Sequence, residues 1–161
     1  VKEKLPNNIG EFRVPLGKVE TTKEGSDITL VTYGSTWRIV MDATNQLERS
    51  GISCEVIDTQ TLVPFDLTHD ISESVKKTNR LLVIDEDVPG GASAYILQNI
   101  IEEQDAYNYL DSEPQTLAAK AHRPPYGKDG DYFSKPSTDD VFEKVYGMMN
   151  EVNPSKFPSL Y

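Results

Sequence analysis

The sequence lacks any long hydrophobic run. No apolar stretch approaches the ~20 residues that a transmembrane helix needs. Residues 1–12, VKEKLPNNIGEF, lack the apolar segment of a secretory signal peptide. The chain has 161 residues and a mean hydropathy of −0.48, which fits one soluble domain with its own core. We therefore expect no membrane partner.

Cysteine is almost absent. Cys54 is the only one, so no disulfide can form within the chain. This fits a reducing compartment, and we expect a cytoplasmic location. Cys54 lies in the apolar segment ISCEVID, which favours a small core residue over a reactive thiol.

Basic residues are outnumbered. The chain carries 16 Lys and Arg against 26 Asp and Glu, a net charge of −10. Nucleic acid phosphates and anionic lipids repel such a surface, so neither is an expected partner. The charge fits part of a soluble enzyme or a surface that meets a basic partner.

Several motifs of catalysis and cofactor binding are missing. The chain has no GxGxxG, GxxxxGK[ST] or GxSxG motif, and neither His69 nor His122 has a CxxC or HxxxH companion. A zinc site is therefore not expected, while a Ser-His-Asp triad stays open. Gly34-Ser35-Thr36 superficially resembles a phosphate-binding turn, but we interpret its hydroxyls as a helix cap.

Alternating short apolar runs and helical patterns are present instead. Residues 12–20 are extended, and Pro15 places them at a sheet edge or outside the sheet. Residues 122–135 form a long irregular loop. Strands alternating with helices predict a mainly parallel sheet covered on both faces. The expected strands are 28–33, 52–58, 80–85 and 115–121, and the expected helices are 37–49, 67–77, 91–104 and 139–152.

The segment 80–98 has the arrangement of a ligand site. A buried strand, Leu81–Ile84, is followed by Asp85-Glu86-Asp87, by the turn Pro89-Gly90-Gly91 and by a helix. Ligands bind at the carboxyl ends of such strands. However, consecutive residues of an extended chain point to alternate sides, so the three acids cannot converge on one ion. We expect a fold element, in which an acid accepts bonds from the Gly90 and Gly91 amides or faces a neighbouring subunit.

His122 and Arg123 follow the last strand and are the weak catalytic candidates. They lie on the ligand side of the sheet if that strand is parallel. Histidine titrates near neutrality and arginine binds carboxylates. The alternative is a rigid interface or linker loop. Trp37 is expected in the core or an interface, and four further aromatic residues are expected to pack against something outside the chain: Tyr107, Tyr109, Phe157 and Tyr161.

A set of segments in fixed order resembles one family. Together they are similar to the C-terminal, transketolase-C-like domain of the β subunit of thiamine-diphosphate-dependent 2-oxo acid dehydrogenases (the E1 component). The resemblance covers roughly residues 13 to 150. Its segments are 14–20, VPLGKVE; 27–35, DITLVTYGS; 51–58, GISCEVID; 61–66, TLVPFD; 75–83, VKKTNRLLV; and the glycine pair at 90–91.

The resemblance implies a fold and a division of labour. It implies a three-layer α/β/α sandwich around a five-stranded, mostly parallel sheet, formed by residues 13–152. Residues 1–12 would be a linker from an N-terminal pyrimidine-binding domain, and residues 153–161 a tail. Thiamine diphosphate and Mg²⁺ would bind outside this domain. No catalytic, cofactor-binding or metal-binding residue is therefore expected in it, and the domain alone would be inactive.

The resemblance also implies partners. These are the E1 α part, a second β copy and the peripheral-subunit-binding domain of the lipoyl acyltransferase (E2). The positions nearest to the family's docking acids are Asp111 and Glu113.

The chain departs from the family in two places. Gln60 stands where arginine is usual, and residues 121–126, AHRPPY, replace a D-x-P-x-P-like segment before an insertion-like stretch, 127–133. These features resemble fused α–β forms, which favours a branched-chain 2-oxo acid as substrate. The alternatives are a pyruvate dehydrogenase β part, a transketolase or deoxyxylulose-phosphate synthase domain, and a non-catalytic binding module.

Overall fold

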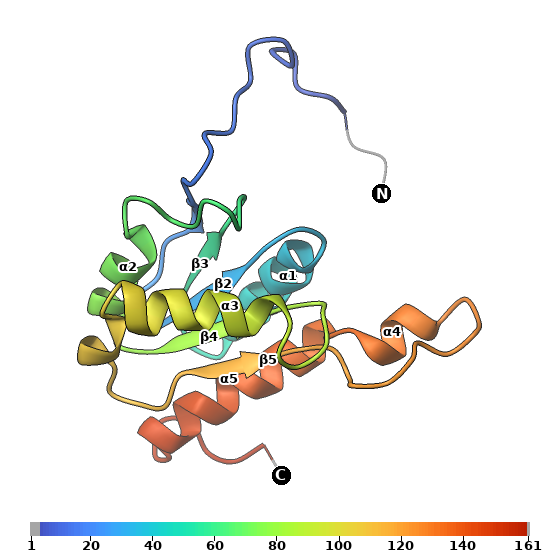
Figure 1. Ribbon diagram of the computed structural model, residues 1–161. Helices are drawn as coiled ribbons and strands as arrows, with labels where there is room; N and C mark the ends of the chain where they lie inside the picture. The colour runs from blue at the N-terminus through green and yellow to red at the C-terminus, as the bar shows by residue number, and fades with distance from the viewer. Residues whose placement is uncertain (1–3, 161) are drawn as a thin grey trace.

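A five-stranded sheet forms the centre of the computed structural model, which describes residues 4–160 (Figure 1). The strand order is β1-β3-β2-β4-β5. The strands β2, β3, β4 and β5 run parallel, and only β1 is antiparallel, at the edge beside β3. The predicted mainly parallel, five-stranded sheet is confirmed. The bounds are β1 Glu20–Lys23, β2 Ile28–Thr32, β3 Cys54–Asp58, β4 Leu81–Ile84 and β5 Gln115–Leu117.

Helices cover both faces of this sheet. The helices α1 and α5 pack on one face, and α2 and α3 pack on the other. The last turns of the α3 helix continue as a π-helix, Asn99–Glu103, and a 3-10 helix follows at Ala106–Tyr109. The predicted three layers are therefore present. The α-helices are α1 Thr36–Arg49, α2 Asp70–Thr78, α3 Ala92–Gln98, α4 Gly130–Ser134 and α5 Thr138–Val152.

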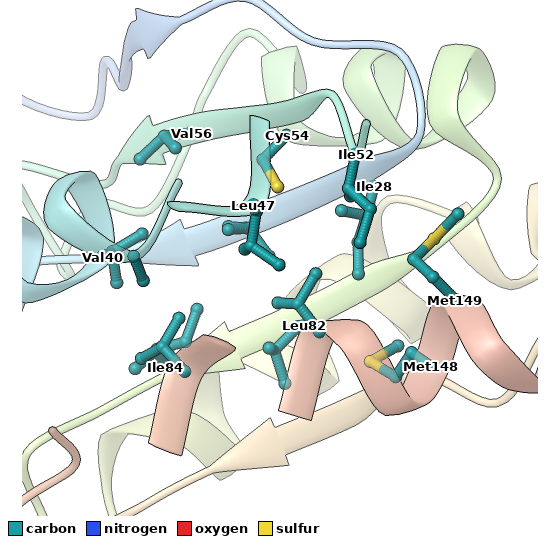
Figure 2. Close-up of a cluster of buried hydrophobic side chains, with 14 of the residues drawn as sticks. Ile28, Val40, Leu47, Ile52, Cys54, Val56, Leu82, Ile84, Met148 and Met149 are labelled. Carbon is teal, nitrogen blue, oxygen red and sulfur yellow. The ribbon is translucent and has the colours of Figure 1, made fainter. Parts of the chain in front are cut away.

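The two layers of the core follow from the alternation of side chains along each strand. In β4, Leu82 and Ile84 face α1 and α5, whereas Leu81 and Val83 face α2 and α3. Figure 2 shows Leu82 beside Leu47 of α1 and near Met148 of α5. Each fully buried side chain of this size contributes about 1.5–3 kcal/mol. The wholly apolar run LLVI is thus explained by burial on both faces.

Residues 12–19 are irregular and lie outside the sheet, which is one of the two positions predicted from Pro15, and the edge strand β1 begins at Glu20. Three other predictions were wrong. The last strand ends at Leu117 instead of residue 121. Helix α2 begins at Asp70 instead of 67, and the predicted loop 122–135 contains the short helix α4.

Helix ends explain some of these differences. Asp66 accepts hydrogen bonds from the backbone N–H groups of Asp70 and Ile71, so it caps α2 from a position four residues upstream. Ser137 and Asp140 form a reciprocal capping box at α5. Helix α1 is followed by a glycine in the left-handed conformation, since Gly51 has a φ of 78°.

The aromatic predictions had mixed outcomes. Phe157 packs within the chain and is buried, because the tail folds back on α5 and its ring lies 6.0 Å from that of Tyr146. The expectation of an outside partner was wrong for this residue. Trp37 packs on the core and donates from Nε1 to Thr22 Oγ1 at 2.9 Å. Tyr107 is exposed, and Tyr161 lies outside the described residues.

Cys54 belongs to the core beneath α1, as predicted. Burial raises the pKa of its thiol to about 12. Within residues 4–160, no helix has both the length and the apolar character needed to cross a bilayer.

Candidate functional site at the carboxyl edge of the sheet

The parallel strands end at one edge of the sheet and bring separate polar segments together there. Residues 33–35 follow β2, and residues 85–87 follow the neighbouring strand β4. Lys135, between α4 and α5, completes the group. This is the edge at which open parallel sheets bind ligands.

Asp85 is fully buried and organises three donors. Its Oδ1 accepts hydrogen bonds from the Tyr33 hydroxyl at 2.6 Å and from the Asp87 N–H at 3.0 Å. Its Oδ2 accepts from the Ser93 N–H at 2.8 Å, at the start of α3. Burial, together with the hydrogen bond to the Asp85 carboxylate, raises the pKa of the Tyr33 hydroxyl. This hydroxyl therefore stays protonated and holds β2 and β4 together.

Glu86 points to a different pair of partners. The Ser35 hydroxyl donates to Glu86 Oε2 at 2.7 Å, and Lys135 Nζ lies 3.0 Å from the same oxygen. These two contacts lower the pKa of Glu86, and the carboxylate in turn raises the pKa of Lys135. The side chain of Ser35 makes no cap at α1, so the predicted hydroxyl cap was wrong. The hydroxyl instead links the β2–α1 turn to the segment after α4.

The predicted contact between the acids and the glycine amides was wrong in detail. The Gly91 N–H donates to the Val88 carbonyl at 2.9 Å, and the buried acid binds Ser93 instead. Asp87 is exposed and accepts from the neighbouring Val88 N–H at 2.8 Å. The side chains of Asp85, Glu86 and Asp87 contact different partners, as we predicted from the alternation of side chains along an extended segment. The group acts as a structural tie between two strand ends, the α3 helix and the segment after α4.

His122 and Arg123 lie past β5, and the parallel pairing of β5 with β4 places them on the predicted side of the sheet. Both side chains are exposed. His122 Nδ1 lies 2.8 Å from the Arg123 carbonyl, and the Arg123 guanidinium donates to the Tyr126 hydroxyl. The His122 ring lies 5.5 Å from that of Phe133. These contacts join residues 122, 123, 126 and 133 and so stay within one surface segment. The arrangement favours the interface alternative.

Asp111 and Glu113 lie at the opposite edge, because they precede β5. Both are exposed, and the backbone N–H of Asp111 donates to the Asn79 carbonyl at 2.9 Å. This contact fixes the Asp111 backbone beside the end of α2 and leaves its carboxylate at the surface.

An exposed apolar surface was not predicted from the sequence. We define the apolar patch as Leu16, Val63, Leu67 and Tyr95, all exposed, with Val63 the most exposed at 81%. Hydrogen bonds join its segments, since the Leu67 N–H donates to the Gly17 carbonyl at 2.8 Å and the Tyr95 hydroxyl donates to the Leu62 carbonyl at 3.0 Å. Surfaces of this kind mark interaction sites. The feature of the sequence from which this patch could have been predicted is the group of apolar residues in the proline-containing stretch 61–67.

A thiamine diphosphate and magnesium site does not fit the side chains present. Within residues 4–160 no group of three His, Cys, Asp or Glu side chains is placed to hold a metal ion. Both oxygens of Asp85 are engaged by donors, and Oε2 of Glu86 is held by Ser35 and Lys135. We therefore derive no reaction step at this edge.

The parallel sheet and its two helical layers define an α/β domain, and comparison with known proteins identifies its class. The chain belongs to the family described as "Transketolase, C-terminal domain", whose model matches residues 17–140. The resemblance seen in the sequence is thereby confirmed.

Individual relatives are β subunits of E1 components. The chain is 38% identical over 133 residues to "Pyruvate dehydrogenase E1 component subunit beta" of Rickettsia conorii, covering 82% of this chain and 40% of that protein. It is 40% identical over 103 residues to "2-oxoisovalerate dehydrogenase subunit beta, mitochondrial" of Dictyostelium discoideum, covering 63% of this chain and 27% of that protein. The chain thus spans less than half of the length of these relatives.

A solved structure shares the fold. The chain superposes on "Split gene transketolase, inactive beta4 tetramer" with a TM-score of 0.66 and 21% identity, covering 85% of this chain and 43% of that one. At this identity the likeness concerns the fold alone. It agrees with the sheet and helical layers described above.

Proposed function

We propose that this chain is the C-terminal domain of the β part of a 2-oxo acid dehydrogenase E1 component. In this proposal the domain packs against neighbouring subunits and docks E2, while thiamine diphosphate and Mg²⁺ bind outside it. Residues 1–12 are the linker from a pyrimidine-binding domain, in a cytoplasmic enzyme that has fused α and β parts. The observation that carries the proposal is the 38% identity to an E1 β subunit over 82% of the chain.

The apolar patch supports the role in subunit packing. A monomeric surface rarely leaves Leu16, Val63 and Leu67 exposed together, and burial of such side chains drives protein association. The E1 α part and a second β copy are the partners that we assign to this patch. A Leu67→Asp substitution should weaken assembly of the intact enzyme, as measured by sedimentation velocity, whereas Asp42→Asn on the exposed side of α1 should not.

Asp111 and Glu113 support E2 docking at the other edge. Both are exposed acids, and an acidic surface suits a basic binding domain. Asp111→Asn should weaken binding of the E2 peripheral-subunit-binding domain to the intact E1, and added salt should weaken the wild-type complex. The matched control is Asp42→Asn. Affinity that does not respond to salt or to Asp111→Asn would argue against docking at this edge.

Two substrates fit the proposal. The departures at residues 121–133 favour a branched-chain 2-oxo acid, and the Dictyostelium relative is named for 2-oxoisovalerate. Pyruvate is the second candidate, because the Rickettsia relative matches more of the chain. Release of CO₂ by the intact enzyme from each acid at equal concentration decides between them.

The division of labour has a direct test. Isothermal titration of this domain with thiamine diphosphate and Mg²⁺ should show no binding, because the Asp85 carboxylate is buried and engaged by three donors and Glu86 Oε2 is held by Ser35 and Lys135. Micromolar binding would contradict the assignment of the cofactor to another domain.

A further inference from the structure

The segment 120–135, which we call the arm, leaves the sheet after β5 and projects beyond the body of the domain before α5 begins (Figure 1). Its base is closed by the Lys120 N–H, which donates to the Ser134 carbonyl at 2.9 Å. Its end is held by the pair of Lys135 with Glu86. Gly130 packs so closely that a Cβ there would lie 2.2 Å from the Pro125 carbonyl oxygen. The arm is therefore a folded element with defined contacts.

Large aromatic side chains cover the outside of the arm. Tyr126 is 86% exposed and Tyr132 is 83% exposed, and Phe133 is also exposed. Such rings are costly to leave in water and are enriched at the centres of protein interfaces. The fixed geometry of the arm does not bury them within this chain.

The arm is also positively charged in an acidic protein. Residues 120–135 carry four Lys and Arg against two Asp, so the arm has a charge of +2 and the rest of the chain −12. Lys120 lies 3.9 Å from the Phe133 ring centre, and Arg123 lies 4.5 Å from that of Tyr126. Among the described residues, neither Arg123 nor Lys128 forms an ion pair with a carboxylate. The arm therefore presents cations and rings together.

A groove of about 490 Å³ lies between the base of the arm and α1, and Asp131, Tyr132 and Lys135 of the arm form part of its lining. Ile39 and Pro136 supply apolar walls, and Asp131 and Asp139 supply carboxylates. The one cation in its lining, Lys135, is already paired with Glu86. The groove thus offers apolar surface and negative charge, which complement a tyrosine and an arginine.

We propose that the arm of one copy of this chain docks in the groove of a second copy, with Tyr126 on the apolar walls and Arg123 at Asp139. Each copy of the chain carries both an arm and a groove. A two-fold arrangement of two copies therefore forms the contact twice and gives a closed dimer. The −12 charge of the body and the acids of the groove disfavour an acidic peptide or a nucleic acid as occupant. This inference rests on the pairing of two copies in the proposed function.

A charge swap tests the contact in the full-length protein. Arg123→Glu should weaken self-association by about tenfold, the scale of one close interfacial charge pair. Asp139→Lys should weaken it similarly, and the double variant should recover most of the loss. Asp139 lies outside the capping box of α5, and circular dichroism melts check that each variant folds. Arg49→Glu, an exposed charge reversal at the end of α1, should have no effect.

The outcome is measured by sedimentation velocity over a range of protein concentrations and at low and high salt. Equal association constants for the wild type, Arg123→Glu and the double variant Arg123→Glu/Asp139→Lys would overturn the proposed contact between arm and groove. The same result with a loss of assembly in Leu67→Asp would leave the proposed function standing. A loss confined to binding of the α part or E2 would assign the arm to that partner and overturn a contact between copies.

Discussion

The hydroxyl of Tyr33 donates to Asp85 Oδ1 at 2.6 Å and so ties the carboxyl ends of two neighbouring parallel strands. The other oxygen of Asp85 accepts from the first turn of α3, so one buried carboxylate joins three elements. A buried acceptor with three donors fixes the geometry of the chain around it. This relationship explains why the acidic run after β4 is a feature of the fold.

Replacement of Asp85 should destabilise the domain strongly. Asp85→Ala leaves the Tyr33 hydroxyl, the buried Ser93 N–H and the partly buried Asp87 N–H without this acceptor, and should cost about 3 kcal/mol. Urea unfolding followed by fluorescence measures the change. Asp87→Asn is the matched control, because Asp87 is exposed, and it should change stability by less than about 0.5 kcal/mol. Equal effects of the two substitutions would contradict the role of Asp85.

Glu86→Gln should have a small effect on stability. Glu86 and Lys135 are both partly exposed, so loss of their ion pair should cost less than about 1 kcal/mol, and high salt should reduce the difference. Thermal melts at low and high salt measure this. Decarboxylation by the intact enzyme should be unchanged, since Glu86 binds Ser35 and Lys135. A large loss of decarboxylation with normal stability would assign Glu86 a chemical role.

Acid should weaken the domain through Glu55. Burial raises the pKa of this carboxyl, but hydrogen bonds from Lys77, Ser74 and the Gly25 N–H outweigh burial and bring its pKa below the ordinary 4.5. The unfolded state therefore binds the proton more readily, so Glu55 stabilises the fold above pH 4.5 and this contribution is lost as pH falls through the lowered pKa.

The Glu55→Gln variant tests this pH dependence. It should be less stable than wild type at neutral pH, and its stability should change less below pH 4.5. Urea midpoints measured from neutral to acidic pH provide the comparison. If the urea midpoints of the two proteins fall in parallel as the pH is lowered, a group other than Glu55 causes the loss of stability in acid.

Replacement by alanine should have opposite effects on the stability of the domain at Gly25 and at Gly147. A Cβ on Gly25 would lie 2.1 Å from the backbone carbon of Cys54, so Gly25→Ala must move the β3 backbone and should cost about 2–3 kcal/mol. Gly147 lies in α5, and nothing stands within 4 Å of its added Cβ. Gly147→Ala should stabilise the domain by about 0.5–1 kcal/mol. Melting temperatures of both variants test the pair, and a stable Gly25→Ala protein would contradict the close approach.

The thiol of Cys54 should be inert in the folded protein. It is buried, and its pKa of about 12 keeps it protonated at neutral pH. Labelling with a thiol reagent should be slow without denaturant and fast in urea. Rapid labelling of the folded protein would mean that the core opens at β3.

The core was predictable because its signals are local. The run LLVI at 81–84 is apolar on both faces, and helix α5 carries Val141, Val145 and Met148 at helical spacing. Boundaries were less predictable. The position of β1 depends on pairing with β3, which the local sequence does not reveal.

The candidate site was only half predictable. Asp85, Glu86 and Asp87 could be located from the sequence, but their partners lie far along the chain. Tyr33 is 52 residues from Asp85, and Lys135 is 49 residues from Glu86. The apolar patch and the groove beside the arm likewise join distant segments.

The alternation of strands and helices, the buried strands, the acidic charge and the family could all be predicted from the amino-acid sequence. Each of these depends on residue type and spacing along the chain, which set side-chain burial and backbone preference locally. The folded structure was needed to find that the buried Asp85 joins two strands and α3, that Ser35 binds Glu86 instead of capping α1, and that the arm adjoins a groove with acidic and apolar lining. The physical reason is that hydrogen bonds and surfaces depend on distances in space, which parallel pairing of the strands sets and linear spacing does not.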